Sequence, residues 1–116
     1  MHLIKSLFRF FYLIIEYGNS IIFHSRYTSL AKRFDIFRFL LLLTIKSKFK
    51  PDLEVNQQVL GLKISANKPY LLLALFREIF IDEVYTFEAF DHKPKIIDCG
   101  ANIGVSVLYF KFRHPN

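Results

Sequence analysis

Residues 95–104 constrain the fold of this chain more than any other segment. Two β-branched residues, Ile96 and Ile97, precede an acid, Asp98, and the following turn leads into an apolar helical pattern at residues 105–112. β-branched residues favour strands, and the glycines of the turn, Gly100 and Gly104, permit backbone bends and a close approach of a ligand to the main chain. The segment therefore predicts a strand, a turn and a helix that together bind a cofactor.

The charges around this turn predict the kind of ligand. The first N–H groups of the helix have no partner within it and carry a partial positive charge, which suits a carboxylate or a phosphate. Asp98, at the carboxyl end of the strand, suits an ammonium group or another hydrogen-bond donor. Asn102 tolerates left-handed geometry, and Gly104 removes a side chain where the helix passes close to strand or ligand. The expected ligand carries both signs of charge close together.

Two common nucleotide-binding motifs do not fit the spacing. A dinucleotide fingerprint that starts at Gly100 needs glycines where Asn102 and Val105 stand. A P-loop needs Gly-Lys followed by Ser or Thr, whereas Gly104 is followed by Val105 and Ser106. The pattern that remains, Asp-x-Gly-x-Asn-x-Gly, resembles the first motif of S-adenosylmethionine-dependent methyltransferases.

With its flanks, the segment resembles the FkbM-type methyltransferases, in which asparagine commonly replaces the second glycine. The similar stretches are residues 97–106, 108–110 and 114–115, together with a lead-in at residues 78–80 and 83–87. The resemblance covers about residues 78–116, and nothing in residues 1–50 belongs to it.

This resemblance implies an enzyme that uses S-adenosyl-L-methionine to methylate a hydroxyl or other nucleophile, often on a sugar, glycan or secondary metabolite. It also implies which residues line the methionine end of the cofactor or lie close to it: Asp98, Gly100, Ala101, Asn102, Ile103 and Gly104. The acid that holds the ribose, and the catalytic and acceptor-binding residues, come later in the family. The catalytic residues are therefore unknown from this sequence.

The expected fold class is α/β, with an N-terminal helical and small β region that leads into the first strand, turn and helix of a Rossmann-like methyltransferase sheet. Residues 1–50 form a basic amphipathic helical region, and residues 51–116 begin the cofactor-binding domain. Because only twelve residues follow Gly104, we expect a truncated, incomplete domain that binds cofactor weakly or not at all and is inactive alone.

Positive charge is concentrated in the first half of the chain. Residues 1–50 hold nine Lys and Arg against two acidic residues, a net charge of +7, whereas residues 51–116 carry −1. Such a basic, aromatic-rich region suits either an accessory helical subdomain with solvated cationic faces or a non-catalytic module that docks on a membrane surface or a partner protein. Peripheral membrane contact would involve residues 1–48, and no nucleic-acid partner is expected. The sequence leaves the oligomeric state unknown.

The single cysteine, Cys99, excludes an intrachain disulfide and suits a reducing compartment, so the expected location is cytoplasmic, with membrane contact at most peripheral. We expect Cys99 to be a small buried thiol, because no histidine lies near it in sequence to activate it. The four histidines are scattered, without the spacing of metal ligands, so surface positions and no metal site are expected.

Hydrophobic periodicity predicts the remaining elements. Apolar residues recur at helical spacing over residues 2–17, and residues 18–20, Gly-Asn-Ser, are expected to end that helix. Charged residues interrupt the apolar run, which excludes a spanning helix and makes a signal peptide a poor fit. Further elements are expected as follows: a helix over residues 28–46 capped by Thr28 or Ser29, a boundary at Pro51, a hairpin of residues 53–60 and 62–64, a helix from Pro69 to about residue 80, and a short strand at residues 85–87.

Overall fold

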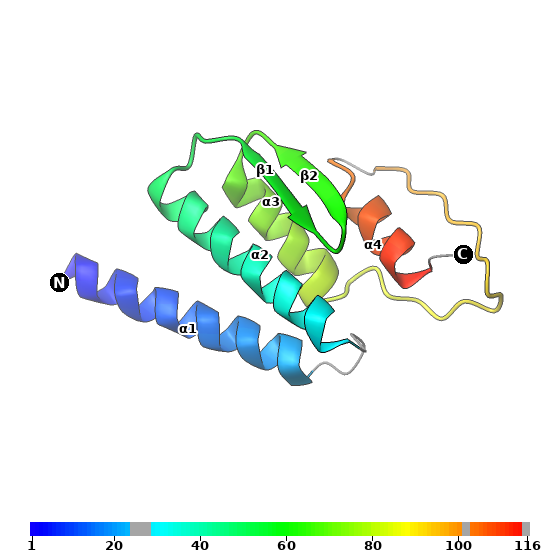
Figure 1. The fold of residues 1–116 in the computed structure, drawn as a ribbon, viewed down its shortest axis with the longest axis horizontal. Coiled ribbons are helices and arrows are strands. Elements are labelled where there is room, and N and C mark those ends of the chain that lie inside the picture. Colours follow the sequence, from blue (N-terminus) through cyan, green and yellow to red (C-terminus); the bar gives the residue numbers. More distant parts are fainter. Residues whose placement is uncertain (24–28, 101–102, 115–116) are drawn as a thin grey trace.

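The computed structural model describes residues 1–23, 29–100 and 103–114. Helices α1 and α2 lie side by side and antiparallel, a β-hairpin and α3 pack on α2, and α4 lies at the far end from the N-terminus (Figure 1). In these residues the elements, in chain order, are α1 (His2–Phe23), α2 (Leu30–Phe49), β1 (Val55–Val59), β2 (Leu62–Ala66), α3 (Pro69–Phe76), a π-helical turn η1 (Arg77–Ile81) and α4 (Val105–Arg113). The molecule is elongated, 54 × 30 × 22 Å.

Helix α1 is longer than its sequence pattern predicts. Residues 18–20 do not end it, and the helix continues to Phe23. Glycine within a helix costs about 1 kcal/mol relative to alanine, but Tyr17 and Ile21 on either side of Gly18 are each only 2% exposed. Burial of these two side chains against the rest of the core offsets the weak helix propensity of the Gly-Asn-Ser stretch.

The hairpin prediction is confirmed, and a hydrogen bond to α2 stabilises the turn of the hairpin. Strands β1 and β2 pair antiparallel with Val59 opposite Leu62, and the two turn residues, Leu60 and Gly61, both have positive φ angles (54° and 79°). Such two-residue turns match the twist of the strands. The Leu60 N–H donates to the Asp35 carboxylate of α2 at 2.6 Å, so an interaction from another element stabilises a conformation that leucine rarely adopts.

The expected helix from Pro69 is present, but it widens into a π-helical turn after Phe76. The Asp82 N–H donates to the Arg77 carbonyl, five residues back, at 2.9 Å. The wider turn allows three consecutive residues, Ile79, Phe80 and Ile81, to be buried together. A regular α-helix would have turned one of them toward solvent.

An aromatic row runs through the core and ends on α4. Phe39 of α2 packs edge-on against Phe76 of α3 (ring centroids 4.8 Å apart), Phe76 stacks on Phe80 of η1 (4.3 Å), and Phe80 packs edge-on against Tyr109 of α4 (5.3 Å). All four side chains are at most 1% exposed. The helix predicted to follow the cofactor-binding turn is thus fixed to the main core by Tyr109.

Two predicted strands are wrong. Residues 94–98 have no strand partner in the described part of the chain, where β1 and β2 pair only with each other. Residues 85–87 form no strand either: the Thr86 N–H donates to the Glu83 carbonyl at 3.0 Å in a turn, and Phe87 stacks on His114. A single strand cannot satisfy its own backbone groups, so both segments remain irregular. The Rossmann-like sheet stays a prediction.

Candidate functional site

Asp98 connects the segment before the turn with the helix after it. One oxygen of its carboxylate accepts a hydrogen bond from the Gly100 N–H at 3.1 Å, and the other accepts one from the Ser106 hydroxyl in the first turn of α4. A carboxylate offers about four acceptor positions, so these two bonds leave room for a further donor. Asp98 is only half-buried, and its carboxylate therefore remains available to a ligand.

Gly104 is the residue that turns the chain into α4. It occupies the N-cap position with φ 84° and ψ 9°, in the left-handed region, and its carbonyl accepts the first helical hydrogen bond, from Leu108 at 3.0 Å. A Cβ added at Gly104 would meet nothing within 4 Å. The glycine is thus needed for its backbone angle, and no side chain or main chain of the described residues packs closely enough to require its small size. Whether a ligand approaches Gly104 closely stays a prediction.

Gly100 has a different role. Its φ does not lie in the left-handed region, and a Cβ added there would also meet open space. Gly100 is therefore not held at the left-handed angles that Gly104 adopts. What glycine provides here is an uncovered main chain beside Asp98, which a ligand can approach closely.

The segment that enters the turn behaves as an extended chain with one side on α4. Pro94, Ile96 and Asp98 are half-buried, whereas the alternate residues Lys95, Ile97 and Cys99 are exposed. This alternation has the period of two that extended chains show. Together with one face of α4, the three half-buried residues line a cavity of about 250 Å³. It is smaller than most small-molecule sites, roughly 300–1,000 Å³.

Four of the six residues predicted to bind cofactor can be located. Asp98, Gly100 and Gly104 lie at the turn as expected, and Ile103 is exposed just before the N-terminus of α4. Ala101 and Asn102 lie outside the described residues. The helix predicted over residues 105–112 is confirmed as α4, with Val105 and Ser106 buried.

Sequence reasoning missed Ser106 as the partner of Asp98. Serine in the first turn of a helix tends to hydrogen-bond nearby groups instead of pointing to solvent, and that tendency was the available signal. The bond matters because it fixes the carboxylate against α4. A second missed contact, 2.6 Å between the Thr86 and Tyr109 hydroxyls, ties the loop before the site to the same helix.

Other candidate chemistry is not present in the described residues. Cys99 is exposed and not buried as predicted, because the segment that carries it is covered on one side only. His92 is exposed and His114 is half-buried against Phe87, while His24 and the side chain of His2 lie outside what the structure describes. Among the described residues no group of three His, Cys, Asp or Glu is arranged to hold a metal ion.

Comparison with known proteins gives one short match. The chain is 42% identical over 41 residues to a curated protein, methyltransferase sdnD of Sordaria araneosa; the match covers 35% of this chain and 16% of the relative. No protein-family profile and no solved structure matches. The chain thus spans a small part of that relative's length, and the match supports a methyltransferase-like relationship for this protein.

Proposed function

We propose that this chain carries the cofactor-binding turn of an S-adenosylmethionine-dependent methyltransferase of FkbM type, within a Rossmann-like sheet. The observation that carries the proposal is the arrangement of Asp98, Gly104 and α4. A half-buried carboxylate at the end of an extended segment is hydrogen-bonded to the first turn of the helix that follows the bend. The partial match to a methyltransferase supports the same class.

The residues at the turn fit the methionine end of this cofactor. Asp98 has acceptor capacity left for an ammonium group, and the N-terminal N–H groups of α4 suit a carboxylate. The main chain at Gly100 is uncovered, so a ligand can approach it. When bound, the cofactor supplies a methyl group on a positively charged sulfur, and a nucleophilic acceptor takes that group.

The chain's own contribution is to bind and orient the cofactor. Asp98 balances the positive charge of the amino-acid end, and its bond to Ser106 holds the carboxylate in place. Tyr109 holds α4 against the core, so that the helix N-terminus keeps its position relative to Asp98. The proposed acceptor is a small-molecule or glycan hydroxyl, and the proposed reaction is O-methyl transfer.

The test is a titration of the 116-residue protein with S-adenosylhomocysteine, followed by backbone amide NMR. We expect binding weaker than micromolar, with shifts confined to the amides of Gly100, Gly104 and Val105. Free methionine should shift the same amides, because it carries the same amino-acid end.

Two variants control this titration. Asp98→Asn keeps the shape and one acceptor oxygen for the Gly100 N–H, and its amide NH2 can donate to the Ser106 hydroxyl. Because the variant removes the charge, the shifts should disappear while the melting temperature changes little. Asp91→Asn, on an exposed loop outside the turn, should titrate like the unmodified protein. Shifts spread over the whole surface, or the same shifts in Asp98→Asn, would overturn the proposal.

A further inference from the structure

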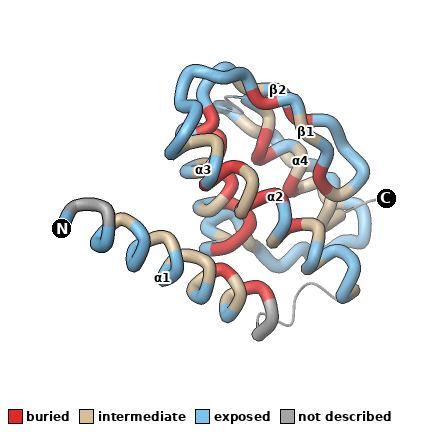
Figure 2. The backbone as a smooth tube through the Cα atoms, turned by 60° about the vertical axis from the view of Figure 1, so that its left-hand side comes forward, coloured by how far each residue is buried: buried red, intermediate tan, exposed pale blue. Residues whose placement is uncertain are grey.

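Helix α1 presents a second apolar face that the core does not use. The residues on this face recur at spacings of three and four, and all of them are exposed: Ile4, Leu7, Phe8, Phe11, Tyr12 and Ile15. Phe8 is 74% exposed. The side chains by which α1 joins the core, Tyr17 and Ile21, lie on a different face. Figure 2 shows exposed and half-buried backbone along most of α1. An apolar row of this size on a soluble surface marks an interaction site.

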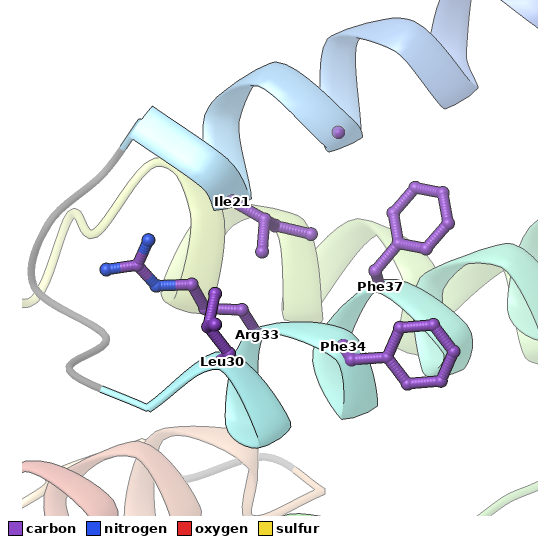
Figure 3. Close-up of a pocket in the computed structure, with 6 residues that line it drawn as sticks. Ile21, Leu30, Arg33, Phe34 and Phe37 are labelled. Carbon is purple, nitrogen blue, oxygen red and sulfur yellow. The ribbon is translucent and has the colours of Figure 1, made fainter.

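Helix α2 also carries exposed apolar side chains. Leu30, Phe34, Ile45 and Phe49 are exposed along it, Phe34 by 69%. Between the two helices lies an apolar cavity of about 400 Å³ lined by Gly18 and Ile21 of α1 and by Leu30, Arg33, Phe34 and Phe37 of α2 (Figure 3). Gly18 stands seven residues after Phe11, on the same row of the helix. The cavity therefore joins the two exposed rows, which we call the α1–α2 apolar face.

The charges of these helices favour an anionic partner. Lys5 and Arg9 are exposed on α1 and border the apolar row next to Tyr12. The acids of residues 1–50 are engaged within the protein: Glu16 pairs with Arg77 at 3.5 Å, and Asp35 accepts from Leu60 and Arg38. The rim of the face is therefore positive.

We propose that the α1–α2 apolar face lies on the surface of an anionic membrane. Helix α1 lies in the plane of the interface, with Phe8 and Phe11 among the acyl chains and Lys5 and Arg9 at the phosphate groups. The cavity beside Gly18 receives part of one acyl chain. In the described part of the chain no helix has the length and apolar character needed to cross a bilayer.

Charge argues for lipid over a second copy of the chain. Pairing two of these faces would bring together two regions that each carry a net charge of +7 within residues 1–50. An anionic bilayer instead attracts each Lys or Arg near its surface. This inference is independent of the proposed cofactor site, because α4 and the turn contribute nothing to the face.

The protein contains no tryptophan, so a single introduced tryptophan reports on its own surroundings. Phe11→Trp places the probe on the face, and Phe90→Trp places a matched probe on a fully exposed loop residue. On vesicles of phosphatidylcholine and phosphatidylglycerol, the Phe11→Trp emission should shift to the blue and be quenched by lipids brominated on their acyl chains. The Phe90→Trp emission should not change.

The dependence of vesicle binding on charge provides a second test, and its variants change only exposed charged side chains. Binding to vesicles of pure phosphatidylcholine should be weak, and added salt should reduce binding to the anionic vesicles. Lys5→Gln or Arg9→Gln should each weaken that binding by about fivefold, as expected for one cation near an anionic surface. Lys63→Gln, on the exposed hairpin, is the matched control and should have no effect.

Three outcomes would overturn this proposal. A blue shift of Phe11→Trp that depends on protein concentration and not on lipid would show that a second copy covers the face. If the Phe11→Trp emission changes neither with lipid nor with protein concentration, the face binds no membrane. Equal responses from the probes at positions 11 and 90 would show that adsorption is not oriented.

Discussion

Two consecutive regions of this chain are built in different ways. Residues 29–81 form a closed arrangement in which α2, the hairpin and α3 cover one another, with Ile36, Leu40 and Val59 fully buried. Residues 82–104 have no regular secondary structure in the described part, and large side chains there, such as Ile97 and Phe90, are exposed. The comparison shows that local sequence patterns suffice for helices and for a hairpin, because a hairpin supplies the partner of each of its own strands. An isolated extended segment, in contrast, becomes a strand only beside another strand.

The largest expected effect tests how much the aromatic row contributes to the stability of residues 29–81. Phe76→Ala removes a fully buried ring that contacts both Phe39 and Phe80, and should lower the free energy of unfolding by about 3–5 kcal/mol. Urea unfolding followed by circular dichroism measures the loss. Phe90→Ala, in the other region and fully exposed, should change stability by less than about 0.5 kcal/mol. Equal effects would remove the distinction between the regions.

The next effect concerns the link between the regions. Tyr109→Phe keeps the ring against Phe80 but loses the bond to Thr86, at a cost of about 1 kcal/mol. Hydrogen exchange should become faster in α4 and in residues 84–87 and stay unchanged in α2. Faster exchange throughout the protein would instead show that the hydroxyl pair supports the whole core.

Three glycines allow a matched comparison of backbone effects. Gly61→Ala and Gly104→Ala each place a Cβ at positive φ and should cost about 1–2 kcal/mol. The first should lower the global melting temperature, and the second should loosen only α4, seen by amide exchange. Gly18→Ala, within α1 and in open space, should stabilise that helix by up to about 1 kcal/mol. A global effect of Gly104→Ala would contradict the local role of the turn.

The smallest effect is a pH dependence at the surface. The hydrogen bond from Lys68 to Asp52, 3.0 Å long, raises the pKa of the Lys68 ammonium above its usual value. A raised pKa in the folded state stabilises the protein below the unfolded pKa, and this contribution is lost as pH rises through the folded pKa. Lys68→Gln should thus alter stability very little at neutral pH, because the pair is solvent-exposed. In thermal melts at neutral pH the unmodified protein should be very slightly more stable than Lys68→Gln, and this difference should vanish at strongly alkaline pH. A difference that persists at alkaline pH would contradict the assignment to this pair.

At the candidate site, sequence reasoning located the turn but not its hydrogen bonds. Asp98 and Gly104 were predicted from residue type and spacing, and both lie where the chain bends into α4. Ser106 was not predicted, because a serine in the first turn of a helix has many alternative partners until the helix direction is fixed. The exposure of Cys99 was also not predicted, since burial depends on what covers a segment.

The sequence by itself determined the local elements: apolar spacing set α2, α3 and α4, and the turn at Gly61 set the hairpin. Tertiary structure decided the rest. Burial of Tyr17 and Ile21 allows α1 to continue beyond Gly18. After Phe76 the helix changes to a π-helical turn, which allows three successive residues to be buried. Among the residues that the structure describes, tertiary structure gave residues 94–98 no strand partner. The physical reason is that side-chain periodicity acts within one segment, whereas burial and strand pairing depend on the segments that pack against it.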